Sequence, residues 1–223
     1  MKPKLFSSSI GRKALMAASG MALVLFLIGH LMGNLLIFSG PDAINAYALK
    51  LRKLGWLLWA ARAGLLAAVI LHTVTSIQLA LENRRARPVA YQVYRTAETD
   101  WIRRTMMLSG VLLLGYLVYH LLHFTFHATN PELGRLRDPL GHQDVYRMMV
   151  LGFSRPWVSI AYIAGVAAVC LHVSHGIGSA FQTLGLNNDK TLPVFTWAGR
   201  LLALGLFLGY SAIPLAVWAG VVK

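Results

Sequence analysis

The run ALMAASGMALVLFLIGHLMGNLLIFSG covers residues 14–40 and carries no charged side chain, although it contains His30 and Asn34. A helix rises about 1.5 Å per residue, so roughly 20 apolar residues cross the hydrocarbon core of a bilayer. This run is long enough to cross, and it is too long for the apolar part of a signal peptide. We therefore predict a membrane-spanning helix that carries a histidine.

The rest of the chain repeats this pattern of long uncharged runs. Only 13% of the 223 residues are charged and 57% are hydrophobic, whereas a soluble domain has about 25% charged residues. The sequence therefore predicts an all-α integral membrane protein, with one transmembrane domain over residues 1–223. The five spanning helices are expected at about 14–38, 57–81, 105–127, 157–181 and 199–222.

The charged residues predict an orientation and exclude some functions. With a cytoplasmic N-terminus, 12 Lys and Arg residues fall on the inner side and 9 on the outer side, in line with the positive-inside rule. The C-terminus is then outside. The net charge of +13 indicates loops that face anionic lipid or an acidic partner, not nucleic acid. Because Cys170 is the single cysteine, the chain has no iron–sulfur cluster or disulfide of its own.

A weak internal repeat places four histidines. Ser19-Gly20 precedes His30 by the same spacing with which Ser109-Gly110 precedes His120. The second and fourth helices share another motif, AAVILH ending at His72 and AAVCLH ending at His172. The chain therefore resembles two helical hairpins of related design, followed by a fifth helix.

The depth of each histidine predicts which ones meet. His30 and His120 lie in the outer halves of outward-running helices, and His72 and His172 lie in the inner halves of inward-running helices. The two levels differ by about seven residues, or roughly 10 Å of helix rise. We expect His30 to face His120, and His72 to face His172, each across the bundle.

Paired imidazoles at two depths favour one kind of chemistry. Polar side chains deep in a membrane are costly and are usually functional. Two facing histidines can occupy both axial positions of a haem iron, which leaves no position for oxygen and predicts electron transfer. We therefore predict a four-helix haem-binding bundle. A transporter or proton relay with paired histidines is the alternative, and a zinc site is disfavoured because neither level offers four ligands.

Several other polar residues are candidates beside these pairs. Ser19 and Ser109 approach the inner level, where each could hydrogen-bond a haem group or, equally well, its own helix backbone. His123 is an alternative to His120, but only His120 keeps the spacing from the Ser-Gly pair. Haem propionates need cationic partners, for which the candidates are Arg62, Arg84, Arg147 and Lys190.

Six segments carry a family resemblance: GRKALMAASG at 11–20, IGHLMGN at 28–34, FSGPDAINAYA at 38–48, ILHTVTSIQLALENRRARPVAY at 70–91, YHLLHF at 119–124 and LHVSHGIGSAFQTLGLNN at 171–188. They resemble the diheme cytochrome b subunit of succinate dehydrogenase and fumarate reductase, in its single-chain, five-helix form. The resemblance covers nearly the whole chain.

This resemblance implies two haem b groups whose axial ligands are His30, His72, His120 and His172. It also favours Arg147 as a partner of the outer haem. The chain would anchor a flavoprotein and an iron–sulfur subunit to the bacterial cytoplasmic membrane, as in respiratory complex II of the tricarboxylic acid cycle. FAD and the iron–sulfur clusters then belong to those partners, and the substrate of this chain is a quinone, expected to be menaquinone.

The resemblance leaves two points open. Some diheme relatives use a glutamate in the fourth helix for proton return, where this chain has Cys170, so a proton path of that kind is in doubt. Asn34, Asn45, Tyr47 and Lys50 are the polar groups near the outer end. A cytochrome b subunit of a hydrogenase or formate dehydrogenase is the alternative function.

Overall fold

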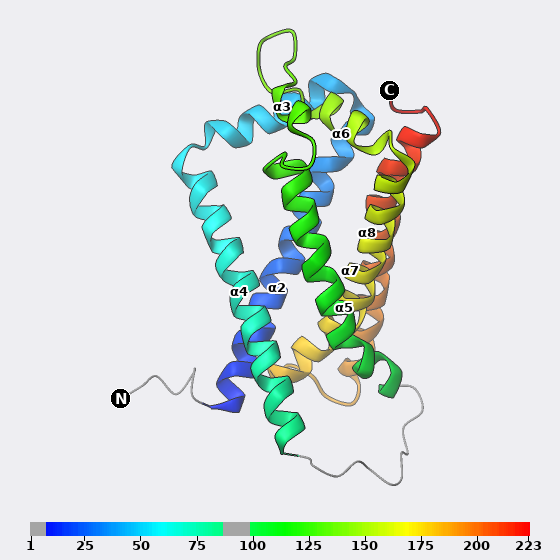
Figure 1. The fold of residues 1–223 in the computed structure, drawn as a ribbon. Helices are drawn as coiled ribbons and strands as arrows, with labels where there is room; N and C mark the ends of the chain where they lie inside the picture. Colours follow the sequence, from blue (N-terminus) through cyan, green and yellow to red (C-terminus); the bar gives the residue numbers. More distant parts are fainter. Residues whose placement is uncertain (1–7, 87–98) are drawn as a thin grey trace.

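The computed structural model describes residues 8–86 and 99–223. Within these residues, five helices are long and apolar enough to cross a membrane, as the sequence predicts (Figure 1). These helices are α2 (Ser9–Leu35), α4 (Trp56–Arg85), α5 (Thr99–His120), α7 (Pro156–Thr183) and α8 (Thr191–Trp218). The protein is therefore an all-α membrane protein.

Each spanning helix begins before its predicted span, but α2, α5 and α8 end short of theirs, at residues 35, 120 and 218. Helix α2 begins at Ser9, and the Oγ of Ser8 caps it by accepting a 3.0 Å hydrogen bond from the N–H of Gly11. Helix α8 begins at Thr191 instead of residue 199. The apolar pattern marks only the part of a helix that lies in the hydrocarbon core of the bilayer, whereas the backbone hydrogen bonds continue into the polar interface.

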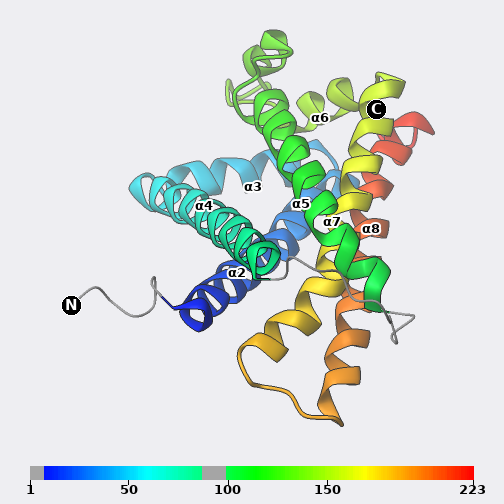
Figure 2. The same ribbon diagram turned by 60° about the horizontal axis from the view of Figure 1, so that its bottom comes forward.

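Helix α7 lies at the centre of the packing. It contacts α8, α5 and α2, whereas α4 packs mainly against α2, and the end-on view shows α4 beside α2 and α5 beside α7 (Figure 2). Glycine allows two of these close contacts. Gly165 of α7 lies directly against the ring of Tyr116 in α5, and Gly199 of α8 lies against Ile177 in α7. Small residues commonly bring membrane helices together in this way.

Shorter helices cover one end of the bundle. They are η1 (Leu36–Ser39), α3 (Pro41–Lys53), η2 (Leu121–Thr125), η3 (Pro131–Arg135) and α6 (Val145–Phe153). Helices α3 and α6 lie across this end, where the C-terminus also lies, and the start of α2 lies at the opposite end (Figure 1). We call the end with α3 and α6 the outer end and the opposite end the inner end, following the predicted orientation.

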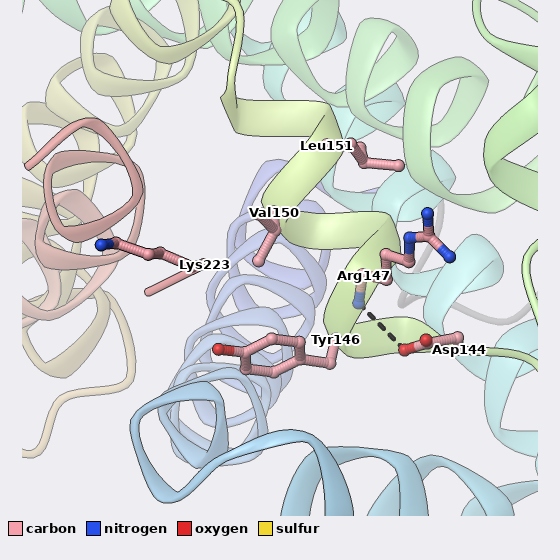
Figure 3. Close-up of a pocket in the computed structure, with 6 residues that line it drawn as sticks. All are labelled: Asp144, Tyr146, Arg147, Val150, Leu151 and Lys223. Atoms are coloured by element: carbon pink, nitrogen blue, oxygen red, sulfur yellow. Dashed lines mark hydrogen bonds between the residues drawn. The ribbon is translucent and has the colours of Figure 1, made fainter. Parts of the chain in front are cut away.

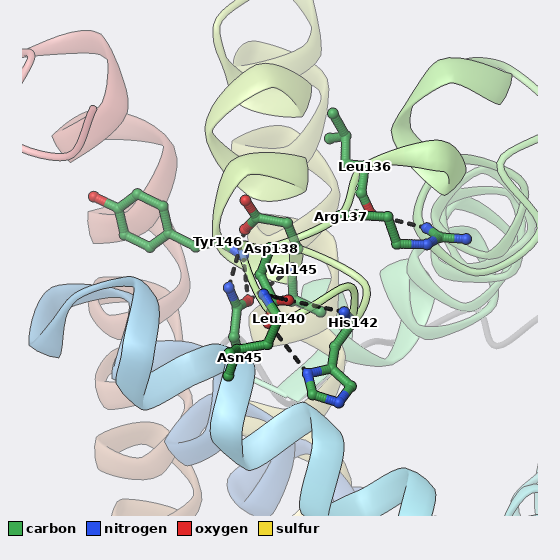
Figure 4. A network of polar contacts seen from close by, with 9 residues as sticks. Asn45, Leu136, Arg137, Asp138, Leu140, His142, Val145 and Tyr146 are labelled. Carbon is green, nitrogen blue, oxygen red and sulfur yellow. Dashed lines mark hydrogen bonds and ion pairs between the residues drawn. The ribbon is translucent and has the colours of Figure 1, made fainter.

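Asn45 joins the two helices of the outer end. Its Oδ1 accepts hydrogen bonds from the backbone N–H groups of Val145 (2.8 Å) and Tyr146 (3.0 Å) at the start of α6. Its Nδ2 donates to Oδ1 of Asp144 at 3.1 Å. Figure 4 shows Asn45 beside Val145 and Tyr146. The first turn of a helix has unpaired N–H groups, and Asn45 satisfies two of them. These hydrogen bonds explain why the polar side chain of Asn45 is buried.

An ion pair joins α2 and α4 near the inner end. The guanidinium of Arg12 meets the carboxylate of Glu82 through two contacts, of 2.5 and 2.8 Å. The pair is bidentate, the stronger arrangement for arginine and carboxylate. It holds together the two helices of the first hairpin.

Candidate functional site

His30 and His120 approach each other in the outer half of the bundle. His30 belongs to α2, and His120 is the last residue of α5. Their ring centres are 5.9 Å apart with an interplanar angle of 82°. Phe26 stacks on His30 at 5.2 Å, and the ring of Tyr210 in α8 is 6.2 Å from it. We call these two histidines the outer pair.

His72 and His172 approach each other from α4 and α7. Their ring centres are 6.1 Å apart with an interplanar angle of 74°, and we call them the inner pair. In each pair, one histidine comes from the first hairpin and the other from the second. The structure thus brings together the same partners that the depth argument pairs.

Each inner histidine has a hydrogen-bond partner at its Nδ1 atom. Nδ1 of His72 is 3.0 Å from the backbone oxygen of Met16, and Nδ1 of His172 is 3.1 Å from Oγ of Ser109. A carbonyl oxygen only accepts, so Nδ1 of His72 carries the hydrogen and its Nε2 keeps a free lone pair. Metal-binding histidines are typically oriented by such a bond on the other ring nitrogen.

The two predicted serines differ in what they contact. Oγ of Ser109 bonds both the backbone oxygen of Met106 (3.1 Å) and the ring of His172. Oγ of Ser19 bonds backbone oxygens of its own helix, at Leu15 (2.7 Å) and Met16 (3.1 Å). Both serines are buried. Ser109 therefore contacts a ring of the inner pair, and Ser19 bonds the same Met16 oxygen that bonds His72.

The two glycines of the repeat lie against these same rings. A Cβ atom on Gly20 would come within 3.0 Å of Cε1 of His72, and one on Gly110 would come within 3.5 Å of Cε1 of His172. The first helix of each hairpin thus supports the histidine of its second helix. Gly176, which follows His175 in α7, has open space within 4 Å of the point where a Cβ atom would lie.

The separation of the rings matches two ligands on opposite sides of one metal ion. Imidazole nitrogens bind metals at about 2 Å, and each ring centre lies roughly 1 Å behind its nitrogen, so in-line ligands place ring centres about 6 Å apart. Both pairs meet this value. No group of three or more His, Cys, Asp or Glu side chains suited to a metal ion occurs among the described residues. A haem iron fits because it requires only two protein ligands.

His123 lies apart from the outer pair. It belongs to the π-helical turn that follows His120, and its side chain is buried at 1% exposure. Its Nδ1 is 3.0 Å from the hydroxyl of Tyr162 in α7, and it stacks on Tyr119. The structure therefore places His120, and not His123, opposite His30.

The remaining histidines are His127 and His142, which lie outside the long helices near the outer end, and His175, which lies within α7. His127, near the outer end, has a positive φ of 54°, and its Nε2 is 3.3 Å from Sδ of Met148. Burial, with a contribution from the positive charge of Arg52, lowers the pKa of His127. His142 pairs with Asp138 at 3.6 Å in the outer loop, and His175 bonds Ser179 at 3.2 Å.

Arg147 lies at the outer end, on α6. It lines a surface pocket of about 300 Å³ (Figure 3), and its backbone N–H donates to the carboxylate of Asp144. The pocket is lined by Asp144, Tyr146, Arg147, Val150, Leu151 and Lys223. Arg62, the other outer candidate, places its guanidinium 5.0 Å from the ring of Trp59. Arg84, an inner candidate, is exposed at the end of α4.

Three contacts around the histidines do not follow from the repeat. Met16 contributes its backbone carbonyl, which the type of its side chain does not indicate. The contact with His72 therefore depends on the rotation of α2. Tyr162 lies in α7 and Tyr210 lies in α8, and neither belongs to the repeated motifs. Tyr162 precedes His172 by ten residues, or about 15 Å of helix, so the depth argument applied to tyrosine would have placed it near the outer pair.

These features define a class: a membrane protein of five spanning helices whose bundle joins two hairpins through two crosswise histidine pairs. The family model for the succinate dehydrogenase/fumarate reductase transmembrane subunit matches residues 81–207. The match covers more than half of the chain, so the protein belongs to this family of membrane subunits. It includes His120 and His172 and ends before α8 does. Neither the curated proteins nor the solved structures gave a match.

Proposed function

We propose that the chain is the diheme cytochrome b anchor of a succinate:quinone oxidoreductase. The observation that carries the proposal is the pair of crosswise histidine contacts, 5.9 and 6.1 Å between ring centres. Membership of the transmembrane-subunit family supports the type of complex. His30 and His120 would hold one haem b, and His72 and His172 would hold the second.

The chain's own residues prepare these positions. The carbonyl of Met16 and the hydroxyl of Ser109 fix the rings of His72 and His172, which lowers the entropy lost when a ligand set forms. The surrounding apolar helices exclude water. Bound haem would supply one-electron transfer, and two histidines would hold each iron.

Membership of the family supports a proposal for the partners and the location. The flavoprotein and iron–sulfur subunits would dock at the inner end, on the cytoplasmic side of a bacterial inner membrane. Of the basic segment 83–104, residues 87–98 lie outside the described residues, but Arg84 and Arg85 are exposed at the end of α4. Electrons would pass between the iron–sulfur subunit and a membrane quinone, which we take to be menaquinone.

The test is the haem content of the purified complex. We expect two haem b per chain in the pyridine haemochrome assay, and one haem in each of the variants H30A, H72A, H120A and H172A. H142A is the matched control, because His142 lies in the outer loop, and it should retain both haems. A wild-type content of one haem, or of none, would contradict the proposal.

A further inference from the structure

The hydroxyl of Tyr162 lies between two imidazoles. It is 3.0 Å from Nδ1 of His123 and 3.5 Å from Nδ1 of His120. The ring centres of the two histidines lie 5.7 and 5.9 Å from that of Tyr162. Helix α7 thus brings one phenol to the same atom, Nδ1, of two histidines that come from consecutive turns of one helix.

The site around this hydroxyl is enclosed by rings. Tyr162 is 5% exposed and His123 is 1% exposed. The rings of Tyr116, Phe124 and Phe153 pack against Tyr162 with centres 5.0 to 5.5 Å away. A buried polar group without a partner costs about 1–3 kcal/mol, so the phenol and the two imidazoles must satisfy one another.

The three groups have one consistent arrangement of hydrogens when His120 offers its Nε2 to a metal. Nδ1 of His120 then carries a hydrogen and donates it to the phenol oxygen. The phenol donates its own hydrogen to Nδ1 of His123, which leaves the hydrogen of His123 on Nε2. In this arrangement His123 faces away from the metal and acts only through Tyr162.

We propose that Tyr162 is the positioning residue of the outer pair, fixing the tautomer and the electron-donating strength of His120. This inference rests on the proposed function. An acceptor at Nδ1 makes an imidazole a more basic ligand, and a more basic ligand stabilises oxidised over reduced iron. The inner pair uses other partners, Met16 and Ser109, so each site can be tuned separately.

The variant Y162F tests the inference in the purified complex. It removes the hydroxyl and keeps the ring contacts. In a redox titration followed by haem absorption, we expect the wild-type complex to show two components. In Y162F, one component should shift to a more positive potential while the other stays in place. S109A is the matched variant at the inner pair and should shift the other component.

Two further variants keep the test decisive if Y162F does not assemble. H123L removes the acceptor of the phenol hydrogen and should shift the same component as Y162F. H123Q keeps an acceptor in its amide oxygen and should remain near the wild-type potentials. Potentials that Y162F or H123L leaves unchanged, or two components that move together, would overturn the role of Tyr162. A wild-type complex without two haems would instead overturn the proposed function.

Discussion

The imidazole of His72 is fixed from two directions by the helix that it packs against. Its Nδ1 bonds the carbonyl of Met16, and its ring edge lies against Gly20. Both contacts come from α2, one turn apart, so the rotation of α2 against α4 determines where Nε2 points. His172 has a looser version of this support, because Gly110 leaves a wider gap.

This difference predicts unequal effects of two alanine substitutions. In G20A the new methyl group would be 3.0 Å from His72, tighter than ordinary contact, and would displace the ring from Met16. We expect the inner pair to bind haem more weakly by about 1 kcal/mol. G110A, the matched control, places its methyl group at ordinary contact distance from His172 and should have no such effect. Haem retained per chain after washing in detergent measures both; equal retention would contradict the prediction.

Sequence and structure agree at the histidines because depth along an apolar helix follows directly from residue number. The hydrogen-bond partners of the histidine Nδ1 atoms were harder to predict from the sequence. Ser109 could be anticipated from its place one residue before Gly110, but its choice between haem and helix backbone could not, and the structure adds a third partner, His172. The carbonyl of Met16 and the hydroxyl of Tyr162 depend on helix rotation, which the apolar pattern of a fully lipid-embedded helix does not encode.

At the scale of helices, the crossing of α5 and α7 depends on Gly165. The ring of Tyr116 occupies the space that a side chain at this position would fill, and Tyr116 also contacts Tyr162 and His120. The crossing therefore sets the position of the rings of Tyr116 and Tyr162 beside the outer pair. Asn45 has a comparable role at the outer end, where it bonds the backbone at the start of α6.

The alanine variant of Gly165 tests the importance of this crossing. A methyl group there would overlap the Tyr116 ring, and overpacking of this kind costs about 1–3 kcal/mol. We expect G165A to unfold at a lower temperature in detergent, as followed by circular dichroism. G176A lies in the same helix with nothing within 4 Å of the added carbon, so its unfolding temperature should be unchanged or slightly higher. An equal fall of the unfolding temperature in both variants would contradict the prediction, because the fall would then not depend on the contact with Tyr116.

Across the whole molecule, arginine–tryptophan pairs lie near both ends of the bundle. Arg155 lies 5.9 Å from the ring of Trp157 at the outer end, and Arg200 lies 5.4 Å from Trp197 at the inner end. Tryptophan and arginine are both favoured where lipid headgroups meet the hydrocarbon. Such pairs at both ends fit helices that cross the full bilayer, and Arg84 and Arg85 are exposed at the end of α4.

Charge reversal at the two ends tests the direction of docking. We expect the double variant R84E/R85E to weaken association with the iron–sulfur subunit about tenfold, since each exposed ion pair contributes roughly 0.2–1 kcal/mol. Lys50 and Lys53 are exposed on α3 at the outer end, so K50E/K53E is the matched control and should bind normally. Co-purification at two salt concentrations measures the effect. Weaker binding in the control alone would place the partners at the opposite end.

The crosswise origin of the pairs also has a consequence for biogenesis. Both members of the outer pair have been synthesised once the chain reaches residue 120, whereas the inner pair waits for His172 in α7. Both histidines of the outer pair are therefore present in the chain earlier in synthesis than both histidines of the inner pair. Because α4 otherwise packs mainly against α2, a cofactor bound by both His72 and His172 would link the first hairpin to the second late in assembly.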